Sequence, residues 1–410
     1  MRLDLVLRAA RLAGRESETV DIGIADGRIA ALAPNLVCDA PAENLDGRLA
    51  VPGFVDTHIH LDKSCILERC QCRLGTLQEA IAEVAAAKRD FTEDDVYARS
   101  RRTLERAIVQ GTTRMRTHVE VDPRVGLTSF HAIARLKRDY AWAIDLEICV
   151  FPQEGLINDP GAEELLIAAC REGADLIGGC PYTDTHPNEQ IARVFAIAKT
   201  FDLDIDFHLD FDLEPSWMHL DEVCRQTRAQ GRGGRVAIGH VTKLSAVDLE
   251  RLAAIGRRLA ETGIAVTVLP ATDLFLMGRG ADHNVPRGVA PAHRLAALGV
   301  TCSIATNNVL NPFTPFGDCS LVRLANLYAN VAQLGRPAEL AQCLDLVTRS
   351  PAALMNLDDY GIAVGQPADI VVLDAPDAAA CVAEVAPPLF GLKAGRRTFT
   401  RSPPVIHRPQ

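Results

Sequence analysis

The chain has 410 residues, of which 48% are hydrophobic and 23% are charged, as in an ordinary globular protein with a sizeable core. Its formal net charge of −10 argues against a general affinity for nucleic acid, because such affinity requires a basic surface. It has no stretch of about 18 or more consecutive apolar residues, the length that suggests a membrane span. We therefore expect neither nucleic acid nor a membrane as a partner.

The first residues, MRLDLVLRAARLAG, favour a short strand over a secretory signal, because Asp4 and three arginines interrupt the apolar run. Twelve cysteines are scattered along the chain without a CxxC pair, and the C-x-C at Cys70 and Cys72 is a weak indication of a metal site. Unpaired thiols are typical of a reducing compartment. We expect a cytoplasmic protein.

Both ends of the chain are patterned as short strands broken by turns. Near the N-terminus we predict strands at Leu3–Arg8, Thr19–Ala25 and Arg28–Leu32. Near the C-terminus we predict strands at Ala368–Leu373 and Gly391–Arg397. The two ends are expected to form one small β-sandwich domain from residues 1–53 and 356–410.

The middle of the chain alternates short β-branched runs with longer helical patterns. Strands are predicted at Phe54–His60, Thr113–Val121, Ile144–Phe151, Asp175–Cys180, Leu203–His208, Arg235–His240, Ala265–Leu269 and Thr301–Thr306. Helices are predicted between them, for example at Leu77–Lys88, Glu163–Arg171, Glu189–Lys199 and Ser245–Thr262. Eight such units predict an α/β fold, a (β/α)8 TIM-like barrel over residues 54–355. An open doubly wound sheet is the alternative, although no GxGxxG follows a strand.

Chemistry in such a barrel takes place at the carboxyl ends of its strands. Four of the eight predicted strand ends carry histidine, at His58 with His60, His118, His208 and His240, although the chain has only 11 histidines. The H-x-H pair points both imidazoles to one side of its strand, because strand side chains alternate with period two. Together with His208 from across the barrel, the pair predicts one divalent metal, Zn or Fe, with a position left open for water.

The motif VPGFVDTHIHLDKS and the late segment GIAVGQPADIVVLDAPD resemble the amidohydrolase superfamily. The segments RTHVEVD, FPQEGL, DFHLD and GHVTKL follow in the order of its cytosine deaminases, so the resemblance covers the whole chain. It implies that His58, His60 and His208 hold the metal. It also implies that Gln153 contacts the amide edge of the substrate and that His240 orients or polarises the attacking water and the substrate.

Two positions depart from the cytosine deaminase pattern. Phe211 stands where those enzymes have a glutamate that shuttles protons, and a phenyl ring can only shape the cavity or stack on a substrate. Asn307, followed by Asn308, stands where they have the aspartate that takes the proton of the water. An amide oxygen can bind a metal or accept a hydrogen bond, but it cannot act as a base near neutral pH.

Other side chains are candidates for the missing functions. His240, Asp210 and Asp273 could supply the base, since Asp210 shares a strand face with His208 and Asp273 follows strand seven. The N-isopropylammelide hydrolases resemble this chain in having a lysine at the position of Lys63, which could bind a substrate oxygen. Our expected catalytic residues are His240, Asp273 and Asn307. The expected substrate-binding residues are Lys63, Gln153, Asp210, Phe211 and Asn308.

The expected function is hydrolysis of a C–N bond in a small nitrogen heterocycle, releasing ammonia or an amine from a cytosine-, pterin- or triazine-like ring by metal-activated water. Opening of a cyclic amide in the same site is one alternative. A catalytically weak homologue that binds a metabolite is another, because Asn307 and Phe211 replace acidic residues. The expected partner is the small heterocycle, and a homo-oligomer remains possible.

Overall fold

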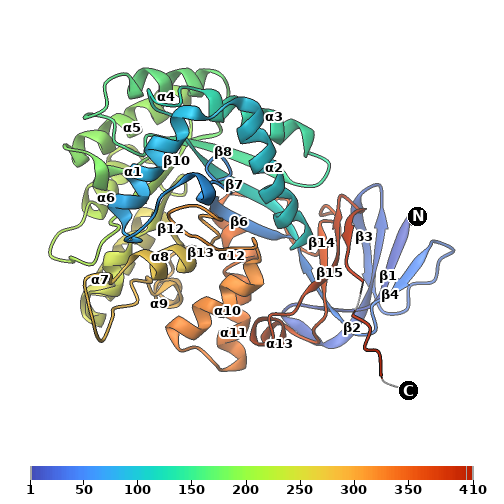
Figure 1. The fold of residues 1–410 in the computed structure, drawn as a ribbon. Coiled ribbons are helices and arrows are strands. Elements are labelled where there is room, and N and C mark those ends of the chain that lie inside the picture. The colour runs from blue at the N-terminus through green and yellow to red at the C-terminus, as the bar shows by residue number, and fades with distance from the viewer. Residues whose placement is uncertain (1, 403, 409–410) are drawn as a thin grey trace.

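A parallel barrel surrounded by helices makes up most of the molecule, and the strands of both chain ends lie beside it (Figure 1). The computed structural model describes residues 2–402 and 404–408. The eight barrel strands follow one another in chain order and pair in parallel. They are β6 (Phe54–Ile59), β7 (Thr112–Glu120), β8 (Asp145–Phe151), β9 (Leu176–Gly179), β10 (Asp204–Leu209), β11 (Val236–His240), β12 (Ile264–Val268) and β13 (Cys302–Ile304).

The first and last strands of the barrel meet at Asn307, three residues beyond β13. The Asn307 amide donates to the His58 carbonyl at 2.7 Å, and the His60 amide donates to the Asn307 carbonyl at 2.8 Å. These two bonds form a parallel bridge opposite Ile59 and close the ring. The predicted (β/α)8 barrel is confirmed, and its seam lies at the predicted metal motif.

Helices surround the barrel and bury one face against its strands. Helix α7 is an example: the Asp248 side chain caps its first turn, Leu252, Ile255 and Leu259 face the core, and Gly263 ends it with a φ of 66°. The helices are α1 (Leu77–Ala87), α2 (Glu93–Val109), α3 (Thr128–Asp139), α4 (Ala162–Arg171), α5 (Pro187–Phe201), α6 (Leu220–Ala229), α7 (Leu249–Thr262), α8 (Pro270–Leu276), α9 (Ala292–Ala297), α10 (Leu321–Ala332), α11 (Pro337–Asp345), α12 (Arg349–Leu354) and α13 (Ala378–Ala383). Among the described residues, none of these helices has the length and apolar character needed to cross a bilayer.

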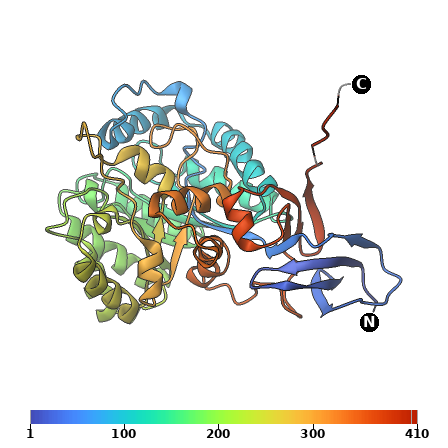
Figure 2. The same cartoon turned by 90° about the horizontal axis from the view of Figure 1, so that it is seen from below.

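The strands of the two chain ends form one mixed sheet, in the order β16-β15-β14-β5-β1-β2-β3 with β4 paired to β1. Figure 2 shows the N-terminal and C-terminal strands together on one side of the barrel. The strands are β1 (Leu5–Leu12), β2 (Arg15–Ala25), β3 (Arg28–Ala33), β4 (Ala42–Asn44), β5 (Leu49–Pro52), β14 (Ile370–Leu373), β15 (Pro388–Lys393) and β16 (Arg396–Thr400). The expected small β domain built from both ends is therefore present.

One predicted strand of this domain is wrong. The segment Gly391–Arg397 is a hairpin rather than one strand, because Ala394 and Gly395 form a turn between β15 and β16 with φ values of 46° and 71°. Positive φ at both central residues is the geometry of the two-residue hairpin turn. We propose the domain limits of the sequence analysis, 1–53 with 356–410 and 54–355, since β6 begins the barrel at Phe54.

Strand β9 has no room for a side chain at Gly178, where it pairs with Asp206 of β10. A Cβ atom added to Gly178 would lie 2.3 Å from the main-chain oxygen of Asp206 in β10, well inside van der Waals contact. Both strands are buried, so neither backbone can move away without disturbing the barrel core. A side chain at this position is therefore expected to strain the fold.

We predict that Gly178→Ala lowers the free energy of unfolding by about 1–3 kcal/mol, the usual cost of overpacking a core. Urea denaturation would measure the change. Gly335→Ala is the matched control, because an added Cβ there meets no atom within 4 Å. The control should stay within about 0.5 kcal/mol of the unaltered protein. Equal stability of both variants would contradict the close packing of β9 on β10.

Candidate active site

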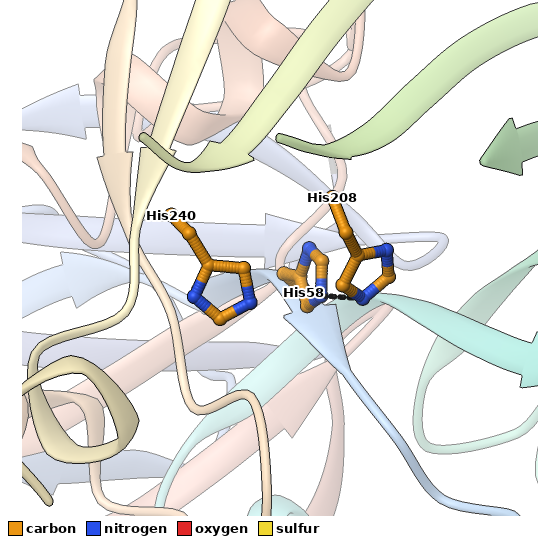
Figure 3. A group of neighbouring side chains, drawn as sticks. All are labelled: His58, His208 and His240. Carbon is orange, nitrogen blue, oxygen red and sulfur yellow. Dashed lines mark hydrogen bonds between the residues drawn. The ribbon is translucent and has the colours of Figure 1, made fainter. Parts of the chain in front are cut away.

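Four histidines from three barrel strands meet at the carboxyl end of the barrel. His58 belongs to β6 and His60 follows it, while His208 comes from β10 and His240 from the end of β11. All four are at most 2% exposed. Figure 3 shows the rings of His58, His208 and His240 gathered in one place, although the three strands lie apart in the sequence.

The ring nitrogens of the predicted metal ligands face one another. The Nε2 atom of His208 lies 3.0 Å from Nε2 of His58 and 3.1 Å from Nε2 of His60. Their Nδ1 atoms are buried and have no hydrogen-bond partner among the described residues. The three histidine ligand atoms that all lie within 4.8 Å of one another belong to His58, His208 and His240, so this close set contains His240 in place of His60.

Burial keeps the imidazoles of His58, His60 and His208 uncharged. It lowers the pKa of His58, His60 and His208 well below the ordinary value, and the neighbouring positive charges lower the pKa of each further. His118 packs behind them, stacked on the His58 ring with centroids 3.7 Å apart. A neutral imidazole keeps a lone pair free, which is the form that binds a divalent cation.

His240 is held by an acidic partner on α8, the helix that follows the next barrel strand, β12. Its Nδ1 atom lies 2.7 Å from the Asp273 carboxylate, and Asp273 on α8 is fully buried. The other carboxylate oxygen accepts from the Leu269 amide at 3.2 Å, so the aspartate is fixed at both oxygens. Burial raises the pKa of Asp273, while the hydrogen bond and the charge of His240 lower it. The structure thus joins two predicted catalytic residues into one pair.

Lys63 and Gln153 approach the site from the side of β7 and β8. The Lys63 ammonium donates to Glu120 at 2.6 Å and to the Gln153 side-chain oxygen at 3.1 Å. It also lies 4.3 Å above the centre of the Phe313 ring. The Gln153 side-chain nitrogen donates to Cys180 at 3.2 Å. These contacts fix the position of the ammonium in the buried interior.

Eight of the predicted site residues line a small cavity of about 10 Å³, roughly the space of one water molecule. Phe211 forms part of its wall, with its ring centroid 3.8 Å from that of His240. The cavity is lined by His60, Lys63, Gln153, Tyr182, His208, Phe211, His240, Asn307, Asn308 and Phe313.

Two predicted residues have unexpected surroundings. The Asp210 carboxylate is not in the cavity wall; it accepts from the amides of His219 and Leu220 at 2.8 and 3.1 Å and caps helix α6. The Asn307 side chain does line the cavity, and its Oδ1 and Nδ2 atoms have no hydrogen-bond partner among the described residues. An unpaired buried amide is costly, so it indicates a group that a bound ligand would satisfy.

The backbone is strained where the strands enter the site. His240, Val241 and Asn307 have φ values of 68°, 44° and 62°, a region that residues other than glycine seldom adopt. Such conformations cost on the order of 1–3 kcal/mol each and cluster at functional sites. Their position at the carboxyl ends of β11 and β13 supports an active site here.

Tyr182 and Phe313 line the cavity but were not predicted. Tyr182 lies in the 3₁₀ turn after β9, and Phe313 in the loop after Asn307. The motifs CPYTD and NPFTPFGD lie at or shortly after the ends of two predicted strands, so aromatic residues in these loops were the available signal. Sequence alone does not say which of several loop aromatics turns inward.

The chain is similar to known proteins over most of its length. A model of the amidohydrolase family matches residues 130–398. The pterin deaminase of Rhizobium rhizogenes is 30% identical over 361 residues, covering 87% of this chain and 82% of that protein. The N-isopropylammelide isopropyl amidohydrolase of Pseudomonas sp. strain ADP is 26% identical over 406 residues, covering 96% of each.

A solved structure gives a similar result. The 5-methylcytosine deaminase of Klebsiella pneumoniae, in complex with 5-fluorocytosine, superposes with a TM-score of 0.94 at 29% identity. The match covers 98% of this chain and 99% of that one. The family model spans more than half of the chain, and the curated relatives span most of it. The chain therefore belongs to the amidohydrolase family.

Proposed function

We propose that this protein is a metal-dependent hydrolase that removes an exocyclic amine from a small nitrogen heterocycle. The observation that carries the proposal is the group of buried, uncharged imidazoles beside the His240–Asp273 pair. The relatives act on pterin, N-isopropylammelide and 5-methylcytosine by their names, which supports a ring with an amino or alkylamino group.

The residues present fit a divalent metal. His58, His60 and His208 offer three neutral nitrogens, a donor set suited to Zn²⁺ or Fe²⁺. Two nitrogens bound to one zinc at about 2.0–2.1 Å lie roughly 3.0–3.4 Å apart, close to the 3.0 and 3.1 Å found here. We prefer His58, His60 and His208 as the ligands over the set that includes His240, because the hydrogen bond to Asp273 orients His240 to act as a base. A divalent metal at this position would lower the pKa of a water molecule to about 7.

His240 is the base in this proposal. Its Nδ1–H donates to Asp273, which leaves Nε2 with its lone pair turned to the site. Nε2 takes a proton from the attacking water and returns it to the leaving amine. Asp273 fixes the tautomer and stabilises the imidazolium in between, as the aspartate of a serine protease triad does. The pair thus supplies the function that Asn307 cannot perform.

The remaining residues hold the substrate. Lys63 and Gln153 present a cation and an amide to the polar edge of the ring. Phe211 and Phe313 offer aromatic faces on which the ring stacks. The unpaired Asn307 amide provides a donor and an acceptor that the ligand satisfies.

A screen for released ammonia or amine tests the proposed reaction. Pterin, cytosine and N-isopropylammelide are the first substrates, and we expect turnover of at least one, abolished by a metal chelator. Loss of ring absorbance without release of an amine would favour opening of a cyclic amide instead. Tight binding without turnover would favour a metabolite-binding homologue and contradict the hydrolase.

We predict that purified protein contains about one metal ion per chain and that His208→Ala loses it, because His208 lies next to both other ligands. Atomic absorption after dialysis would measure Zn and Fe. His131→Ala is the control, since His131 is an exposed histidine paired with Glu172 on the outer surface. Equal metal content in the two variants would exclude the proposed ligand set.

We predict that Asp273→Asn lowers kcat about 10²–10⁴-fold with little change in KM, because the amide no longer fixes the His240 tautomer. Steady-state kinetics on the substrate found in the screen would measure both constants. Asp282→Asn, a change at an exposed aspartate of the following loop, is the matched control. A kcat within threefold of the unaltered enzyme would mean that His240 does not depend on Asp273.

A further inference from the structure

Three carboxylates, two of them fully buried, surround one lysine next to the proposed active site. The Lys88 ammonium, at the end of α1, lies 2.8 Å from Glu120, 2.5 Å from Asp122 and 2.7 Å from Glu154. The Lys88 side chain is 1% exposed, and those of Glu120 and Asp122 are 2% and 0% exposed. None of these residues takes part in the chemistry proposed above.

The Lys88 ammonium lies between the three carboxylates, in the position that a metal cation would take. Ligand oxygens of Glu120, Asp122 and Glu154 lie within 4.8 Å of one another, close enough to bind a single ion, and Lys88 donates to all three. Burial alone would lower the pKa of Lys88, but the three carboxylates outweigh it and raise the pKa above the ordinary value. Lys88 is thus charged and fixed, and its removal would leave the buried carboxylates of Glu120 and Asp122 without the cation between them.

Glu120 connects this cluster to the cavity. Its Oε2 atom accepts from Lys88, and its Oε1 atom accepts from Lys63 at 2.6 Å. Its main-chain amide donates to Asp62 at 2.9 Å, which fixes the backbone at the end of β7. Burial would raise the pKa of Glu120, but Lys63 and Lys88 lower it to about 2. The carboxylate is therefore ionised, with one oxygen for each lysine.

Lys63 connects Glu120 to the cavity in which the substrate is proposed to bind. Its ammonium has three N–H donors, and Glu120 and Gln153 accept two of them among the described residues. Lys63 also lines the cavity. A small rotation of Glu120 would draw the ammonium away, because the 2.6 Å bond to Glu120 is the shorter of its two contacts.

We propose that Lys88 is a positioning residue: by fixing Glu120, it holds the Lys63 ammonium where it binds an oxo substituent of the heterocycle. The inference rests on the proposed function for the identity of the ligand. The arrangement of Lys88, Glu120 and Lys63 does not depend on it. Lys88 acts only through Lys63, so its effect on substrate binding disappears when Lys63 is absent.

Kinetics of a double-mutant cycle test this dependence. The variants are Lys88→Met, Lys63→Met and the combination, assayed with N-isopropylammelide or pterin, whichever the unaltered enzyme turns over. Loss of a hydrogen bond to a charged group predicts a KM about 10–100-fold higher in each single variant, with a smaller change in kcat. The combination should raise KM no further than Lys63→Met alone. Equal effects of Lys88→Met with and without Lys63 would overturn the proposal.

Lys137→Met is the matched control, because Lys137 also binds a carboxylate, that of Asp175 at 2.7 Å, but lies partly exposed on α3. It should leave KM unchanged. If Lys88→Met does not fold, Glu120→Gln replaces it, since the amide keeps the shape but removes the charge. A normal KM in Glu120→Gln would equally overturn the proposal.

A crystal structure of Lys88→Met separates this inference from the proposed function, because it needs no turnover. We expect the Lys63 ammonium to leave Glu120 or Gln153 by more than hydrogen-bond distance. An unmoved Lys63 would overturn the positioning role even if the enzyme is active. A displaced Lys63 in a protein without turnover would support the positioning role while the proposed reaction fails.

Discussion

The main-chain bridge between β6 and Asn307 is the constraint on which the site depends. It closes the barrel at the point where His58 and His60 leave β6, and it gives Asn307 a left-handed backbone. The bridge therefore sets His58, His60 and Asn307 at fixed separations before any ligand binds. Preorganised groups of this kind bind a metal or stabilise a transition state without a cost of rearrangement.

Around this seam the cavity has two unlike sides. On one side, His240 and Asp273 form a pair suited to moving protons. On the other, Lys63 carries a fixed positive charge backed by Glu120 and Lys88. A ring bound between them would have its reacting carbon at the histidines and its oxygen at the lysine. Asn307 brings no carboxylate to the cavity, and the charged side chains beside it are Asp273 on one side and Lys63 on the other.

The fold was largely predictable because its signals are local. Strand periodicity located all eight barrel strands. The histidines at the strand ends could then be chosen as site residues, because barrels of this kind carry their chemistry at the carboxyl ends of the strands. The hairpin at Ala394–Gly395 was missed, because alanine seldom adopts positive φ and gives no turn signal in sequence. Its partner Gly395 alone did not outweigh the strand pattern.

The contacts of the site were less predictable, because they join distant segments. Asp273 and His240 were each candidates, but their hydrogen bond depends on how α8 packs on β11. Asp210 shares a strand with His208, yet the start of α6 takes up its carboxylate. Lys88 ends the predicted helix Leu77–Lys88, and only the folded chain shows three carboxylates around it.

The central claim is that His58, His60 and His208 hold the metal while His240 remains free to act as a base. Anomalous diffraction from crystals of the purified protein, recorded at the zinc and iron absorption edges, tests it most directly. We expect one peak about 2.0–2.1 Å from a ring nitrogen of each of the three histidines, with the His240–Asp273 hydrogen bond intact. A peak bound to His240 in place of His60, or no peak in active protein, would contradict it.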